Sequence, residues 1–73
     1  MTRSAVHPAV RQLSALRRDH RISLAKLGAV LGYSPYVIGA WERGRYWPKL
    51  KALCDWASYF GLQVKLEPFP DQK

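Results

Sequence analysis

The chain of 73 residues is long enough for one domain, and its 48% of apolar residues can form a small core, which excludes disorder throughout. Its single cysteine, Cys54, cannot form an internal disulfide, which fits a cytoplasmic protein. Residues 1–51 hold ten of the twelve basic residues but only two of the five acidic ones, and the formal net charge is +7. This distribution favours a phosphate-binding surface in residues 1–51 and leaves the near-neutral remainder for another role.

The N-terminal part predicts an arm followed by a helix. We expect residues 1–7 to form a flexible arm and residues 8–20 to form the first helix. The apolar residues that recur at helical spacing on its inner face are Val10, Leu13 and Leu16. His7 and His20 are far apart in sequence, and Cys54 is the only other soft ligand, so we expect no metal site and no cofactor.

Residues 23–44 predict two short helices joined by a tight turn. Ser23 can cap the first of them, and Gly32 can end it in the left-handed conformation. Ser34 can cap the second helix, and Pro35 suits its first position because the missing N–H costs nothing there. Gly44 then ends the second helix. Two helices joined by a glycine-containing turn of a few residues form the outline of a helix-turn-helix.

Residues 13–62 resemble the helix-turn-helix of phage repressors, Cro proteins and the wider xenobiotic-response-element regulators. The matching residues are Leu16, Arg17, Ser23, Leu27, Leu31, Gly32, Ser34, Ile38, Trp41, Glu42, Arg43, Gly44 and Pro48. The resemblance implies an all-α, lambda-repressor-like domain of four to five helices over residues 8–61, encoded by a bacterium or phage. The second helix would brace on the DNA backbone and the third would enter the major groove. It also implies a structural ion pair between Arg17 and Glu42.

Two residues of the second helix depart from that family pattern. Leu24 stands where a glutamine commonly contacts phosphate, and Gly28 stands where a small alanine is usual. The remaining backbone ligands in this helix are Ser23, the first N–H groups and Lys26. The resemblance implies that Arg43 and Arg45, at the end of the third helix, bind phosphate most strongly.

The exposed face of the third helix is expected to be apolar. With Ile38 and Trp41 facing the core, no glutamine, asparagine or arginine remains on the first turns to distinguish base edges by bidentate hydrogen bonds. We therefore expect contacts with thymine methyl groups and DNA shape, or alternatively an apolar face that docks on a protein. The complete set of expected DNA-binding residues is Ser23, Lys26, Ser34, Pro35, Tyr36, Val37, Gly39, Ala40, Arg43 and Arg45.

The C-terminal part predicts a fourth helix and a short β-strand. The helix should run from Pro48 to about Phe60. Its expected inner stripe is Leu50, Leu53, Cys54, Ala57 and Phe60, and Trp56 and Tyr59 are expected on an adjoining, uncovered face. Residues 62–67 alternate apolar and polar side chains, as a half-buried strand does. A lone strand leaves its backbone unpaired, so we expect this strand to pair with the same strand of a second copy. The alternatives are a strand folded back on its own domain or a frayed tail, and residues 62–73 together form the expected C-terminal strand and tail. The expected dimerisation residues are Trp56, Tyr59, Leu62, Val64 and Leu66.

These patterns favour a DNA-binding transcriptional regulator that acts as a homodimer and represses by covering its operator. The alternative is a protein-interaction module or antitoxin of the same fold, which holds a protein partner. An enzyme is the weakest hypothesis, because the sequence has no phosphate loop, metal set, catalytic triad or nucleophile elbow. A membrane partner is not expected, because the longest uncharged run, residues 27–41, is too short and broken to span a bilayer.

Overall fold

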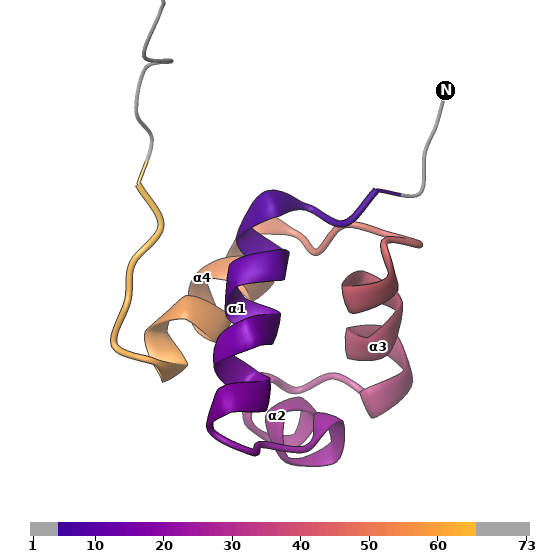
Figure 1. The fold of residues 1–73 in the computed structure, drawn as a ribbon, viewed down its shortest axis with the longest axis horizontal. Coiled ribbons are helices and arrows are strands. Elements are labelled where there is room, and N and C mark those ends of the chain that lie inside the picture. Colours follow the sequence, from indigo (N-terminus) through magenta and orange to yellow (C-terminus); the bar gives the residue numbers. More distant parts are fainter. Residues whose placement is uncertain (1–4, 66–73) are drawn as a thin grey trace, which may run out of the picture.

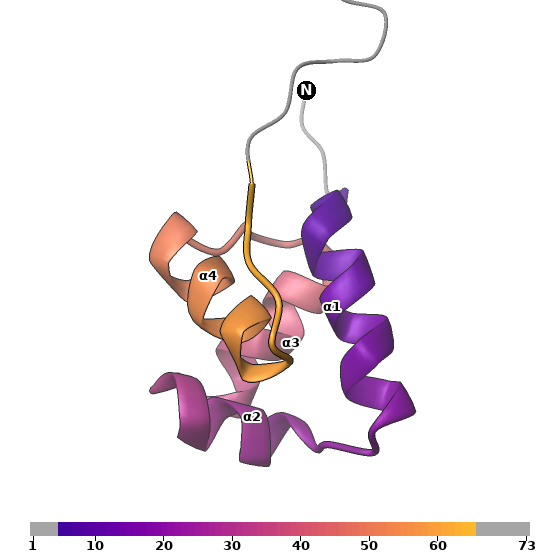
Figure 2. The same ribbon diagram turned by 90° about the vertical axis from the view of Figure 1, so that its left-hand side faces the viewer.

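The computed structural model describes residues 5–65, which form four helices (Figure 1). These are α1 (Pro8–Asp19), α2 (Leu24–Leu31), α3 (Pro35–Arg43) and α4 (Leu50–Tyr59). Helices α1 and α3 lie side by side, α2 crosses below them, and α4 packs against α1 and α2 (Figures 1 and 2). The described part is therefore all-α, as expected, and none of its helices has the length and apolar content needed to cross a membrane.

The ends of α2 and α3 follow from the capping residues that the sequence predicts. The Ser23 hydroxyl accepts a hydrogen bond from the Lys26 N–H at 3.0 Å, and the Ser34 hydroxyl accepts one from the Val37 N–H at 3.2 Å. Each hydroxyl satisfies one of the backbone donors that a helix start leaves unpaired. Both helices end at a glycine with left-handed φ, and the turn between them spans only residues 32–34. The short turn and its caps set the angle between α2 and α3.

Gly28 is the position where α2 needs a glycine for space. A Cβ atom there would collide with the carbonyl oxygen of Tyr33 in the turn. The Gly28 carbonyl also accepts hydrogen bonds from the Gly32 and Tyr33 N–H groups, which close the end of α2. The departure from alanine at this position therefore lets the turn pack tightly onto the helix.

The core lies where the four helices meet. Its largest fully buried side chains are Val10, Leu27, Ile38 and Trp56. The Trp41 and Trp56 rings lie beside each other, with centroids 6.2 Å apart. A small domain of this size depends on such large side chains for most of its buried apolar surface.

Helix α4 buries Leu53 and Ala57 of the predicted inner stripe, but the predicted exposure of Trp56 and the predicted burial of Leu50 are wrong. Trp56 has no exposed surface, whereas Leu50, which was expected on the inner face, is 67% exposed. The buried residues of α4 are Ala52, Leu53, Trp56 and Ala57. Small alanine residues on this face leave room for the indole, so the buried stripe keeps Leu53 and Ala57, gains Trp56 and loses Leu50.

The two ends of the described chain differ from the expectations for them. Residues 5–7 pack on the domain: Val6 contacts the core, and a nitrogen of the His7 ring accepts a hydrogen bond from the Ala9 N–H at 3.0 Å. Residues 62–65 run beside α1 and α4 without forming a strand (Figure 2). Leu66 and the rest of the predicted strand lie outside the described residues.

Candidate nucleic-acid interface

Helix α3 presents a short apolar face at its N-terminal end. Pro35 and Tyr36 are exposed, with Tyr36 at 64%, and Val37 is half-buried. Ile38 and Trp41 face the core as predicted. The only polar atom that the Tyr36 side chain offers to a base edge is its hydroxyl. The exposed turn of α3 is therefore suited to apolar contact with one hydrogen bond.

Gly39 and Ala40 are both buried, so their predicted place in the groove is wrong. Helix α3 packs against both α1 and α2, which buries a wider arc of its surface than one neighbour would. Leu24 of α2 and the Arg43 side chain cover Gly39. The surface that α3 can offer to a ligand is thus confined to its first turn and to Arg43.

Arg43 folds back along α3 toward the start of α2. A Cβ atom at Gly39 would lie 3.0 Å from an Arg43 guanidinium nitrogen and 3.5 Å from a Leu24 methyl carbon. Leu24 is the first residue of α2, where unpaired N–H groups carry partial positive charge. The absence of a side chain at Gly39 leaves room for the guanidinium there, close to the Leu24 side chain in the first turn of α2. Both groups attract an anion such as a DNA phosphate.

The other cations near this surface are free. Lys26, Arg43 and Arg45 are exposed, and within residues 5–65 none of them forms an ion pair. Ser23 and Ser34 are also exposed, but their hydroxyl oxygens already accept the capping hydrogen bonds. We define the basic surface as Lys26, Arg43 and Arg45 together with the exposed first turn of α3, residues 35–37.

An ion pair behind the basic surface holds α3 in place. The Arg17 guanidinium donates two hydrogen bonds to the Glu42 carboxylate, at 2.7 and 2.9 Å, and a third to the Ile22 carbonyl oxygen at 2.7 Å. The two side chains are only 13% and 8% exposed. This pair, which the resemblance implies, joins α1, the following loop and α3. Its fork geometry fixes α3 in direction as well as in position.

A family model described as helix-turn-helix matches residues 13–66 of the chain. The chain belongs to the helix-turn-helix family. This is a family of DNA-binding regulatory domains rather than of enzymes. No curated protein and no solved structure matches the chain significantly.

The loop after α3 of this helix-turn-helix domain is held by the N-terminal segment, a contact that the sequence analysis missed. The Trp47 indole N–H donates a hydrogen bond to the Ala5 carbonyl oxygen at 2.8 Å, and the His7 ring meets the indole edge-on at 4.4 Å. Forty-two positions separate Trp47 from Ala5, and no local pattern reports such a contact. Trp47 and Tyr46 remain about 60% exposed. They line a hollow of about 350 Å³ together with Tyr33, Val37, Trp41 and Lys49.

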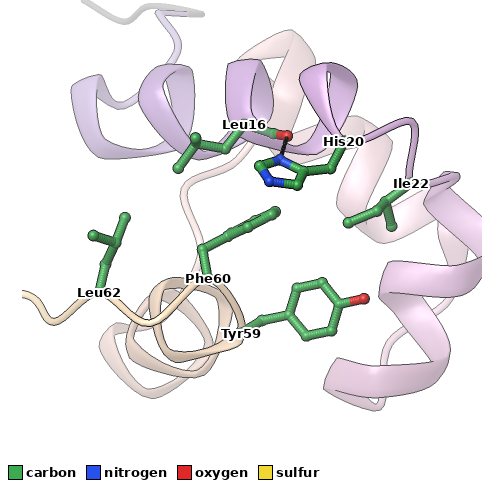
Figure 3. A pocket seen from close by; sticks show the side chains of 6 residues that line it. All are labelled: Leu16, His20, Ile22, Tyr59, Phe60 and Leu62. Atoms are coloured by element: carbon green, nitrogen blue, oxygen red, sulfur yellow. Dashed lines mark hydrogen bonds between the residues drawn. The ribbon is translucent and has the colours of Figure 1, made fainter.

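A second, apolar surface lies away from the basic one, between the C-terminal ends of α1 and α4 (Figure 3). It is a groove of about 560 Å³ lined by Leu16, His20, Ile22, Tyr59, Phe60 and Leu62, which we call the apolar groove. His20 and Phe60 face each other across it, with ring centroids 5.4 Å apart (Figure 3). Of the residues predicted to make a dimer, Tyr59 and Leu62 lie here, and Val64 is 37% exposed beyond it.

The helix-turn-helix domain offers no metal site within the described residues. No group of three histidine, cysteine or carboxylate side chains gathers in residues 5–65. Cys54 is a half-buried free thiol.

Proposed function

We propose that this helix-turn-helix domain binds duplex DNA and represses transcription by covering its operator. The observation that supports this most is the Arg43 guanidinium, which lies over Gly39 close to the Leu24 side chain in the first turn of α2, while Lys26 and Arg45 are exposed and form no ion pair within residues 5–65. A phosphate that reached both Arg43 and the start of α2 would meet a bidentate donor and a helix N-terminus. Arg45 and Lys26 would contact flanking phosphates and set the register of α3 in the major groove.

Base reading in this proposal depends on the first turn of α3. The exposed side chains of Pro35 and Tyr36 and the half-buried side chain of Val37 can contact thymine methyl groups, and the Tyr36 hydroxyl can make one hydrogen bond to a base edge. Ala40 and Gly39 no longer belong to this set, because both are buried. We therefore expect discrimination that depends strongly on thymine methyls. Replacing thymine by deoxyuridine in a selected duplex, which removes only the methyl group, should weaken binding.

We further propose that two copies associate through the apolar groove and residues 62–65. Tyr59, Leu62 and Val64 are exposed apolar side chains in one region, and the backbone of residues 62–65 forms no strand within the single chain. Pairing this segment with its copy would satisfy the backbone groups of both. A two-fold dimer would present two α3 helices to half-sites about one DNA turn apart.

Titration of fluorescent duplexes across a salt series tests DNA binding. Affinity should fall steeply as salt rises, and each phosphate ligand removed should lower the slope of log affinity against log salt by about 1. Lys26→Gln, Arg43→Gln and Arg45→Gln supply three such variants, and Lys51→Gln is a control of equal charge on α4, outside the basic surface. Affinity that stays flat between low and moderate salt would refute the proposal.

A protein partner is the second candidate function, and the exposed Tyr46 and Trp47 side chains favour it. Large aromatic side chains lining a hollow are typical of protein interaction sites and could hold a toxin or another protein. The double variant Arg43→Glu, Arg45→Glu separates the two functions. A DNA reader loses duplex binding, whereas a protein-docking module keeps its partner.

A further inference from the structure

A small hollow between α1 and α3 is distinct from the basic surface and from the apolar groove. It has a volume of about 190 Å³ and is lined by Val6, Arg11, Ser14, Arg18 and Glu42. The three α1 residues among them are spaced by three and four positions, so they lie on successive turns of one helix face. The hollow therefore combines two guanidinium groups and one hydroxyl on a rigid element.

The Ser14 hydroxyl in this hollow is buried but has no hydrogen-bond partner. Ser14 is 3% exposed, and its oxygen makes no hydrogen bond within residues 5–65. Buried hydroxyl groups in folded proteins are nearly always hydrogen-bonded to protein, water or a ligand. Because Ser14 is one of the residues that line the hollow, a polar group bound there can supply the missing partner of this hydroxyl.

The charges around the hollow indicate the sign of the charge that the bound polar group carries. Two hydrogen bonds from Arg17 engage the Glu42 carboxylate and balance its charge. Arg11 and Arg18 are exposed, and neither forms an ion pair within the described part of the chain. Their positive charge is therefore uncompensated, and both guanidinium groups can donate forked hydrogen bonds to an oxyanion.

We propose that this hollow binds a single small oxyanion of the phosphate class. Ser14 donates one hydrogen bond to it, while Arg11 and Arg18 supply its counter-charge from either side. The Glu42 carboxylate also lines the hollow, and its pairing with Arg17 is what makes an anion tolerable there. The source of the oxyanion is either free phosphate or the phosphate backbone of DNA. The site stands independently of the proposed DNA contacts, because it shares no residue with them.

Thermal unfolding in sodium phosphate, compared with sodium chloride at equal ionic strength and pH, tests this site. At 10 mM phosphate a millimolar site should raise the unfolding midpoint by at least about 4 °C. Ser14→Ala should abolish the rise without lowering the midpoint in chloride, since it removes an unpaired hydroxyl. Arg18→Gln should reduce the rise, and Lys51→Gln, which removes the same charge from an exposed residue of α4, should leave it unchanged.

Phosphate also stabilises many proteins by exclusion from their surface, and the Ser14→Ala comparison separates that effect from binding. An equal rise in the wild type and in Ser14→Ala would overturn the proposal. Amide chemical shifts in the wild type give a second measurement that needs no variant. Changes on adding phosphate should concentrate at residues 11–18 and 42, and changes spread evenly over the chain would also overturn it.

Duplex binding identifies the source of the oxyanion. If Ser14→Ala weakens duplex binding and phosphate competes with the duplex, the hollow takes a backbone phosphate. If duplex binding is unchanged while the thermal effect is lost, the hollow takes a free oxyanion. If the wild type binds no duplex, the proposed function is refuted. The thermal unfolding data then decide alone whether the oxyanion site exists.

Discussion

The basic surface and the apolar groove differ in what holds their residues in place. On the basic surface, the helix caps and Gly39 position the cations, and none of those cations is used in an ion pair within residues 5–65. In the apolar groove, side chains from α1, α4 and the segment after it meet only because the core brings those helices together. The first surface depends on local geometry and the second on the packing of the whole domain. Variants that disturb one without the other can therefore separate their roles.

The largest effect should come from breaking the ion pair behind the basic surface. Arg17→Ala leaves the Glu42 carboxylate buried without its partner, and the loss of one member of such a pair costs about 3–5 kcal/mol of unfolding free energy. Urea denaturation measures this loss. Lys51→Ala is the control, because it breaks an exposed ion pair with Asp55 that should contribute little. An equal small loss in both variants would show that the pair does not hold α3.

Gly28→Ala should destabilise the turn that separates α2 from α3. The added methyl group collides with the Tyr33 carbonyl oxygen, which is backbone and cannot rotate away. We expect a loss of about 1–3 kcal/mol, as in other overpacked sites, despite the higher helix propensity of alanine. Thermal and urea unfolding both measure it. Unchanged or increased stability would show that the turn can move away from α2, and the fixed angle between the helices would then be in doubt.

Leu62→Asp should weaken self-association and leave the fold intact. Leu62 is 49% exposed at the apolar groove, so burying it against a second copy would bury a charge in the variant. Sedimentation equilibrium should show a dissociation constant at least about tenfold higher, equivalent to about 1.4 kcal/mol. Gln63→Asp, which adds one negative charge at an exposed polar residue of the same segment, controls for the added charge. A wild type that is monomeric at high micromolar concentration would contradict the proposed dimer.

The contrast between the two surfaces also explains which structural features could be predicted from the sequence. Serine caps and glycines act within four residues, so the ends of α2 and α3 could be predicted from Ser23, Gly32, Ser34 and Gly44. The family pattern then supplied the ion pair joining α1 to α3. These features depend on neighbours along the chain or on a recurrent motif, and both are visible in one sequence.

Features that depend on distant packing could not be predicted. The burial of Ala40 requires α3 to contact two helices, and the burial of Trp56 depends on which side of α4 meets the core. Apolar periodicity gives the width of a helix face but leaves its rotation open when leucine, tryptophan and tyrosine occur on adjoining sides. The contact between Trp47 and Ala5 spans 42 positions and has no local signal.

The smallest effect on stability, and the sharpest test of the basic surface, should come from Gly39→Ala. The new methyl group would lie 3.0 Å from an Arg43 guanidinium nitrogen, and because that group is the end of a flexible side chain it can swing away. Stability should therefore rise by up to about 1 kcal/mol from the gain in helix propensity. Duplex affinity should fall nonetheless, because Arg43 no longer lies over Gly39 close to the first turn of α2. Arg43→Gln tests the cause: once Arg43 is absent, adding Gly39→Ala should weaken binding no further, whereas additive losses would assign Gly39 a contact of its own with DNA.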